Sequence, residues 1–598
     1  MDKQNFRNMV LAGALTLLIF IGWDWGMGYL YPNANKAPTP AASSPAAGAP
    51  IAAASTSPAG QAALPGQVAQ PGQPRDLKAA LDPASRVAIA APGLAGSINL
   101  IGGVIDDLTT SRHSTALDKA QGPERIFAPA GTPRQQFAQF GWSAGDGTAA
   151  IPLPDARTVW TVPAGAKLTP QTPVTLSWNN GAGQAFSLTY AIDADYMLTI
   201  KQQISNTGPA AVAIKPIAQL NREQPPADDK EALDTFNVHA GPFGAFDGAV
   251  SFGNNYDDVA GAKLLDNKGK TDWIGFTDIY WMSTLIPEKT DATSDFRAIG
   301  KGVFLADLFY PQVSIAPGQQ SAQVTRLFAG AKESSVLDRY EAQGITKFGL
   351  TIDWGWFRWF EKPIFWLLSK LFELTNNFGV AIIALTVIVR GLMFPIAQRQ
   401  FASMAAMRAI QPKMKAIQER YKDDKQKQQE EVMALYKKEG VNPLAGCLPI
   451  FLQIPVFFAL YKVLTLSVEM RHQPFFGWIK DLSGPDPAHI LNLFGLLDFT
   501  PPGFLSIGVL ALLLGITMHL QFKLNPAQMD PAQQQVFAMM PWIMMFIMAP
   551  FAAGLLIYWN TSNVLTIAQQ AYLYSKHPDL KAQADKGEQD AKRAKGRG

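Results

Sequence analysis

Polar side chains occur inside stretches of this sequence that are otherwise apolar enough to lie in lipid. In IIALTVIVRGLMFP, Arg390 is about five residues from the inner end of the run, on the order of 8 Å inside at 1.5 Å per residue. Two later apolar runs contain FLQIPVF and IYWNTSN. The polar or amphipathic residues of the three runs are Thr386, Arg390, Gln453, Trp559, Asn560 and Asn563. Such groups support charge pairing and hydrogen bonding rather than bond-breaking chemistry.

Three interpretations of these residues stay open from the residue pattern alone. Arg390 can be an anchor whose long side chain reaches the inner surface. The amides and Thr386, one helical turn before Arg390, can join helices by hydrogen bonds. The same residue types, placed on inward faces, also line a water-filled groove.

Motifs for nucleotide or metal chemistry are missing from the sequence. The stretch NKGKT lacks the glycine that a phosphate-binding loop needs five residues before Gly269, because that position is Leu264. The six histidines fall singly, without metal-ligand spacing, and Cys447 is the only cysteine. We therefore expect no catalytic residue, no cofactor and no metal.

The first half of the chain has three parts with different compositions. A basic lead and an apolar run ending in Trp and Tyr predict a retained signal anchor rather than a cleaved signal peptide. The Ala, Pro and Gly-rich stretch that follows cannot bury enough apolar surface to fold and is expected to be a disordered linker. Alternating apolar and polar residues separated by turn residues then predict a large antiparallel β-sandwich.

The second half contains an aromatic and basic segment typical of an interfacial helix, followed by five apolar runs. Basic residues concentrate in the loop after the first of these runs and in the tail, so both are expected in the cytoplasm, with the β-domain on the other side. The prediction is a signal anchor at 1–31, a linker at 32–76, a β-sandwich domain at 77–349, an interfacial helix at 350–376, transmembrane helices at 377–395, 444–468, 503–523, 533–550 and 554–574, a cytoplasmic helical hairpin at 396–443, an extracytoplasmic loop at 469–502, a cytoplasmic loop at 524–532 and a basic tail at 575–598.

Methionines recur at helical spacing in the hairpin, including Met404, Met407 and Met414. They fit the seam of a solvated hairpin, and the other interpretation is an adaptable surface that receives varied apolar segments.

Several stretches in the second half resemble one known family. They are TIDWGWFRWFEKPIF, TVIVRGLMFP, the run from MRAIQPKMKAI to VFFALY, PFFGWIKDLSGPDP, DPAQQQVFAMMP and GLLIYWNTSNVLTIAQQ. In this order they cover nearly all of residues 351–570 and resemble the YidC/Oxa/Alb family of membrane protein insertases, specifically its bacterial members with six spans and a large periplasmic domain. The first half agrees more loosely, through the anchor, the linker and the β-rich region.

The resemblance implies a multi-pass α-helical membrane protein of six transmembrane helices, with a five-helix insertase core and an all-β periplasmic super-β-sandwich domain. It implies a hydrophilic groove, open to the cytoplasm and to lipid, in which Arg390 receives an incoming chain. The implied groove residues are Thr386, Arg390, Gln453, Ile454, Pro455, Trp559, Asn560 and Asn563; at Trp559 relatives often have tyrosine. The residues implied to meet ribosomes or targeting partners are Met404, Met407, Met414, Asp530, Lys592, Arg593, Lys595 and Arg597.

The function implied is insertion and folding of nascent membrane proteins, alone or with the Sec translocon, without nucleotide hydrolysis. The implied partners are nascent membrane proteins, the Sec translocon, ribosomes, signal recognition particle pathway components and the lipid bilayer, in the bacterial inner membrane with both termini in the cytoplasm. Two alternatives are a small-solute transporter and a membrane-tethered sugar-binding β-sandwich protein. A transporter would be expected to show an internal repeat among its spans. A sugar-binding β-sandwich would be expected to contain a cluster of histidine and carboxylate side chains, but the only histidines in the sandwich are His113 and His239.

Overall fold

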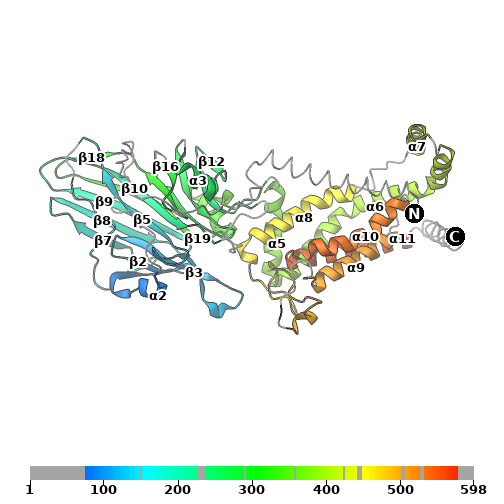
Figure 1. Ribbon diagram of the computed structural model, residues 1–598, viewed down its shortest axis with the longest axis horizontal. Coiled ribbons are helices and arrows are strands. Elements are labelled where there is room, and N and C mark those ends of the chain that lie inside the picture. Colours follow the sequence, from blue (N-terminus) through cyan, green and yellow to red (C-terminus); the bar gives the residue numbers. More distant parts are fainter. Residues whose placement is uncertain are drawn as a thin grey trace, which may run out of the picture.

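The computed structural model describes residues 75–576, with gaps at 148–150, 227–237, 268, 289–290, 301, 356–357, 422–423, 441–447, 498, 500–505 and 525–530. A β-domain and a helical bundle lie end to end along the long axis (Figure 1). The predicted anchor, the linker up to residue 74, Asp530 and the tail residues Lys592, Arg593, Lys595 and Arg597 lie outside the described residues, as do the side chains of Met404 and Met407.

Two large sheets form the β-domain, which confirms the predicted β-sandwich. In the described residues the first sheet has the order β13-β16-β17-β10-β5-β3-β2-β1-β6, with β18 paired to β10 and β4 paired to β3. Its strands are β1 (Arg86–Ala90), β2 (Leu94–Asn99), β3 (Val104–Ser114), β4 (Pro123–Phe127), β5 (Gln136–Ala144), β6 (Lys167–Leu168), β10 (Val212–Glu223), β13 (Leu264–Asn267), β16 (Thr293–Ala298), β17 (Val303–Phe309) and β18 (Val313–Ile315).

The second sheet has the order β12-β11-β14-β15-β19-β9-β8-β7. Its strands are β7 (Val174–Asn179), β8 (Gln184–Ile192), β9 (Met197–Asn206), β11 (Gly241–Phe246), β12 (Ala249–Ser251), β14 (Thr271–Thr277), β15 (Trp281–Pro287) and β19 (Gln320–Ala331). Between the strands named here, all pairs are antiparallel except for the parallel pair of β1 and β6. Within the stretch NKGKT, Asn267 is the last residue of β13 and Thr271 is the first residue of β14.

Strict alternation explains why these sequences form half-buried strands. In β8, Phe186, Leu188 and Tyr190 are buried while the residues between them are more exposed. Phe186 meets Trp142 of the opposite sheet edge-on, with ring centroids 5.1 Å apart. Short helices decorate the domain: α2 (Leu77–Ala80), α3 (Tyr256–Ala262), α4 (Ser334–Ala342) and the 3-10 turns η1 (Pro83–Ser85), η2 (Lys119–Gln121) and η3 (Phe348–Thr351).

The bundle consists of long helices of the second half. They are α5 (Arg358–Thr375), α6 (Phe378–Arg420), α7 (Lys425–Glu439), α8 (Leu448–Leu466), α9 (Val509–Leu524), α10 (Pro531–Met548) and α11 (Ala553–Lys576), with the 3-10 turns η5 (Val468–Met470) and η6 (Leu493–Gly495) between α8 and α9. Asn377 caps α6 by accepting a hydrogen bond from the Val380 amide. This helix continues for 43 residues, so the predicted second span and the first arm of the hairpin are one helix.

The bundle helices differ in the length of their apolar segments. In the part of the chain that the structure describes, Phe378–Gln398 is long and apolar enough to cross a membrane. Gln453–Leu466, Val509–Lys523 and Ala538–Met548 are shorter apolar helical segments. Six transmembrane helices therefore stay a prediction.

Arg471, just after α8, connects the bundle to the β-domain. Its guanidinium donates to the carbonyl oxygens of Ser114 at 2.8 Å and Thr115 at 3.1 Å. It also lies over the rings of Tyr280 and Trp281, at 5.6 and 5.5 Å from their centroids. Because Arg471 is buried, this contact fixes the two halves of the chain against each other.

Candidate functional site

Arg390 lies on α6 inside the apolar segment Phe378–Gln398. It is twelve residues from the helix start, or about 18 Å at the helical rise per residue. Its guanidinium Nε donates to the Ser562 hydroxyl of α11 at 3.0 Å, and Nη2 donates to the same oxygen. Among the described residues no carboxylate forms an ion pair with Arg390, so its positive charge is held by a neutral hydroxyl.

One face of α11 provides two hydroxyls to neighbouring helices. Tyr558 and Ser562 are four residues apart, which places them one above the other on that face. Both are buried. The Tyr558 hydroxyl accepts a hydrogen bond from the Gln453 side-chain amide on α8. We call Arg390, Gln453, Tyr558 and Ser562 the polar cluster, which joins α6, α8 and α11.

A second network connects α11 to α9. The Thr517 hydroxyl donates to Asn560 Oδ1 at 3.2 Å, and Asn563 Nδ2 donates to Thr517 Oγ1 at 3.0 Å. Asn560 Nδ2 also donates to the carbonyls of Leu510 and Leu556, at 3.0 and 2.9 Å. Asn560, Asn563 and Thr517 are thus hydrogen-bonded to one another, as expected for polar groups that join helices.

The remaining predicted groove residues have different surroundings. Thr386 is fully buried, and its hydroxyl donates to the Ile382 carbonyl of its own helix at 2.6 Å. Ile454 is exposed beside Pro455, which lies inside α8. Trp559 meets Phe457 of α8 edge-on, with ring centroids 5.3 Å apart. Trp559 therefore packs toward α8, whereas Asn563 bonds to α9.

Sequence reasoning missed Tyr558, Ser562 and Thr517. Tyrosine, serine and threonine alter the hydropathy of an apolar run only weakly, so they did not stand out beside arginine and amides. The available signal was the four-residue spacing of Tyr558, Ser562 and Thr566 along α11.

The polar cluster supplies hydrogen-bonding groups and one positive charge. The described residues contain no group of three or more His, Cys, Asp or Glu side chains that could hold a metal ion. What the polar cluster offers is a guanidinium with five donors, two of which meet Ser562. A carboxylate or a row of backbone carbonyls entering the bundle is the chemistry that such a group attracts.

The hairpin after the apolar part of α6 is antiparallel. Lys413 Nζ of α6 lies 2.7 Å from Glu439 Oε1 at the end of α7. The Tyr436 hydroxyl donates to the Met414 sulfur at 3.2 Å. Met414 therefore belongs to the seam between the two arms, which agrees with the first of the two interpretations of the methionines for this residue.

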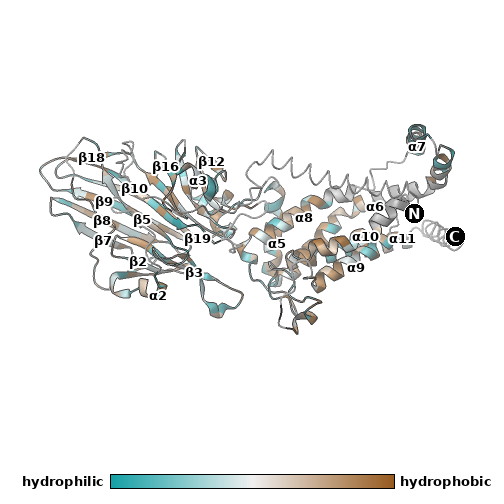
Figure 2. Cartoon of the chain, in the orientation of Figure 1, coloured by the Kyte–Doolittle hydropathy of each residue, from teal (hydrophilic) through white to brown (hydrophobic). Residues whose placement is uncertain are grey.

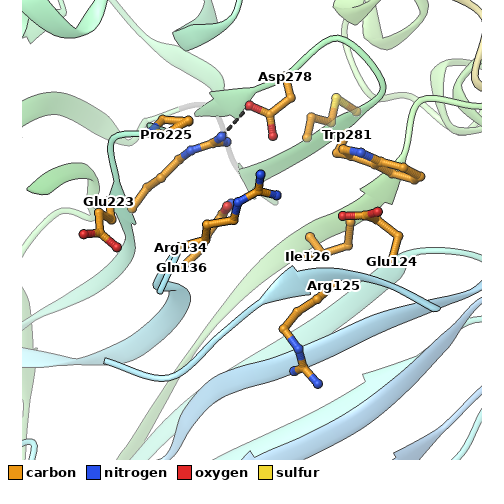
Figure 3. A pocket seen from close by; sticks show the side chains of 11 residues that line it. Glu124, Arg125, Ile126, Arg134, Gln136, Glu223, Pro225, Asp278 and Trp281 are labelled. Carbon is orange, nitrogen blue, oxygen red and sulfur yellow. Dashed lines mark hydrogen bonds and ion pairs between the residues drawn. The ribbon is translucent and has the colours of Figure 1, made fainter. Parts of the chain in front are cut away.

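A cavity of about 70 Å³ in the β-domain bears on the sugar-binding alternative. Arg222 and Asp278, which both line this cavity, form an ion pair. Figure 3 shows Asp278, Arg134 and Trp281 around the cavity. The cavity is far below the roughly 300 Å³ at which small-molecule sites begin. Neither predicted histidine lines it: His113 bonds to Glu333 at 3.0 Å, and His239 lies 3.0 Å from the Pro242 carbonyl.

Comparisons with known proteins agree with this division of the chain. The family model described as "YidC periplasmic domain" matches residues 86–367, and the one described as "60Kd inner membrane protein" matches residues 370–581. The chain is 40% identical over 592 residues to a membrane protein insertase YidC from Zymomonas mobilis, covering 98% of both chains. It is 41% identical over 615 residues to one from Ruegeria pomeroyi, covering 97% of both. A crystal structure of an active YidC insertase aligns over 81% of this chain and 92% of its own, at 18% identity and a TM-score of 0.35.

Proposed function

This chain belongs to the YidC family of membrane protein insertases, and we propose that it inserts nascent membrane proteins along the polar cluster around Arg390. Its relatives are named as insertases, so the chain is an insertase and not an enzyme. Family membership also gives it a bacterial inner-membrane location and a periplasmic domain.

The observation that carries the mechanism is the charge of Arg390 inside an apolar helix segment. A buried charge is normally paired with an opposite charge. Arg390 is half-buried, and its partner is the neutral Ser562, which orients the guanidinium without cancelling its charge. An acidic segment of an incoming chain would therefore meet an uncompensated positive charge. Such a contact offsets part of the cost of removing that segment from water.

Partition into lipid supplies enough free energy without a nucleotide. A new span of about 20 Leu-like residues gains roughly 0.3 to 0.6 kcal/mol per residue, on the order of 6 to 12 kcal/mol in total. Each tail charge at mid-membrane costs about 2.5 to 3.5 kcal/mol. The membrane potential contributes a further ~2.3 kcal/mol per 100 mV for each negative charge moved outward. The role of the protein is then to lower the barrier rather than to supply work.

The proposal includes the finer features that the sequence predicted. The groove is formed by Thr386, Arg390, Gln453, Ile454, Pro455, Trp559, Asn560 and Asn563, to which we add Tyr558 and Ser562. Six spans put both termini and the hairpin in the cytoplasm, because the basic residues gather there. The hairpin, the loop with Asp530 and the basic tail are then available to ribosomes, signal recognition particle pathway components and the Sec translocon.

Reconstitution tests this mechanism directly. The purified protein is placed in liposomes without nucleotide and given a two-span substrate that carries a photo-crosslinker in its first apolar segment. We expect protease-protected substrate, crosslinked to residues next to Arg390 and Gln453. An active preparation that protects the substrate but crosslinks only elsewhere would contradict the proposed path. A folded preparation that protects none would contradict independent insertion.

A further inference from the structure

The loop between α8 and α9 ends in a tip whose polarity is reversed relative to a water-soluble surface. We call residues 491–497 the loop tip. Leu491, Leu493, Phe494, Leu496 and Leu497 are between 46% and 83% exposed, whereas the one polar side chain, Asn492, is 7% exposed. Figure 2 shows this loop near the end of the bundle that faces the β-domain, with hydrophobic colouring along part of it. A polar interior with an apolar exterior suits contact with lipid.

Several backbone amides of the tip are hydrogen-bonded within the loop, as an environment without water requires. The amide of Leu493 donates to the Ile490 carbonyl at 3.1 Å, and that of Phe494 donates to the His489 carbonyl at 2.8 Å. The amide of Leu497 donates to the Asn492 carbonyl at 3.0 Å. These bonds satisfy donors that would be costly to leave unpaired in an apolar medium. Leu493 and Phe494 adopt positive φ angles of 50° and 62°, which bulky residues rarely do, so the structure holds the exposed arrangement against its local preference.

The base of the loop holds the tip in a fixed position. Asp486, which is 1% exposed, accepts hydrogen bonds from the Trp478 indole at 3.0 Å and from the Leu510 amide at 2.8 Å. The Ile490 amide donates to the Ile507 carbonyl at 3.0 Å, just before α9 begins. The tip therefore starts from the first turn of α9, at the end of the bundle nearest the β-domain.

Three features identify lipid as the occupant of this apolar surface. Residues 487–497 contain no Asp, Glu, Lys or Arg. The exposed apolar side chains continue along α9 as Leu513, Ile516 and Leu520, on the helix that the loop enters. A docking site for a protein would be expected to have a polar rim with hydrogen-bonding side chains, whereas the exposed side chains of the tip are apolar.

We propose that the loop tip inserts into the outer leaflet of the bilayer and contacts acyl chains beside the outer end of α9. The proposal rests on the membrane orientation proposed above. It assigns a role to residues 491–497, which belong to the extracytoplasmic loop predicted at 469–502.

The test places a bimane fluorophore at the most exposed residue of the tip. In a protein with Cys447 replaced by serine, Leu496→Cys is labelled and reconstituted in phosphatidylcholine and phosphatidylglycerol vesicles. The matched control is Val159→Cys in the β-domain, which is also highly exposed at 65%. We expect iodide on both sides of the vesicles to quench the label at 496 roughly fivefold less than the label at 159, because an interfacial apolar group is withdrawn from water. Lipids with nitroxides near the headgroup should quench 496 and spare 159.

Two results would overturn the proposal. One is equal iodide quenching at 496 and 159, with no quenching by nitroxide lipid. The other is protection of 496 only through a second copy, seen as a disulfide between two Leu496→Cys chains. Substrate protection measured on the same vesicles reports insertion separately, so failure of the loop contact and failure of the insertase mechanism give different results.

Discussion

If Arg390 meets acidic substrate tails as proposed, replacing Ser562 by aspartate should remove the resulting preference for acidic over neutral tails. Ser562 is buried, and its hydroxyl lies 3.0 Å from Arg390 Nε, so a carboxylate at this position would contact the guanidinium. At about 4 Å and an effective dielectric constant near 20, two unit charges attract by about 4 kcal/mol. An acidic tail would have to displace that internal partner, and at 1.4 kcal/mol per decade its contact with Arg390 weakens by up to ~10³-fold.

The assay uses two substrates that differ only in their translocated tails, one with aspartates and one with asparagines at the same positions. Protease protection in liposomes gives the ratio of acidic to neutral insertion for each variant. We expect Ser562→Asp to lower this ratio to the value of Arg390→Ala, while neutral-tail insertion changes little. Ser562→Asn is the matched control, since it has nearly the volume of aspartate without the charge.

Two outcomes would refute this reasoning. A Ser562→Asp protein with an unchanged thermal midpoint in detergent, yet with the original ratio, would mean that the charge of Arg390 does not meet substrate tails. Equal loss of both substrates in Arg390→Ala would make Arg390 an anchor of α6 against α11.

Three other residues give predictions that are independent of that assay. Burial, followed by the charge of Asp307 directly across on β17, raises the pKa of Asp295 from 3.8 to about 8. The folded β-domain thus keeps a proton that the unfolded chain releases, and its stability falls as the pH rises from about 4 through 8; Asp295→Asn should raise the unfolding midpoint more at pH 8 than at pH 5. Arg471→Ala should lower the free energy of unfolding by about 3 to 5 kcal/mol, because it leaves the buried Glu124 carboxylate, 3.9 Å away, without this partner. The check is the rate at which trypsin releases the β-domain, which should be fastest for Arg471→Ala and intermediate for Arg471→Lys. Asn563→Ala should lower the free energy of unfolding by about 1 to 3 kcal/mol, because it removes the donor to the Thr517 hydroxyl. The measurement is the thermal unfolding midpoint in detergent, which Val564→Ala, on the exposed face of α11, should lower less.

The β-domain shows which parts of a fold a sequence reveals. Alternation in β8 and turn residues between strands predict a sandwich correctly, because burial of every second side chain is a local property. Strand order is not local. The pairing of β13 with β16, or of β1 with β6, depends on which distant strands together bury the core, so no short stretch encodes it.

The candidate site, like the β-domain, has features that the sequence reveals and features that it does not. Arg390 and Gln453 stand out in the sequence because charge and amides are rare in apolar runs. Their partners could not be predicted, since Arg390 and Ser562 are 172 positions apart and meet only when α6 packs against α11. The continuity of α6 through Pro395 was also missed, because proline is normally a sign that a helix ends or bends.

The two hydrogen-bond networks on α11 differ in whether they leave a charge unpaired. This difference matters for how a fixed helix can bind different substrate segments in turn. Toward α9, Asn560, Asn563 and Thr517 bond to one another, so that contact is complete in the resting protein. Toward α6, Ser562 orients Arg390 but leaves its charge uncompensated among the described residues. In the proposed mechanism, an acidic segment binds on the α6 side without first breaking the contact that joins α11 to α9. Because a hydroxyl partner can be released at a cost of about 1.5 to 3 kcal/mol, the substrate can enter and also leave, which repeated insertion requires.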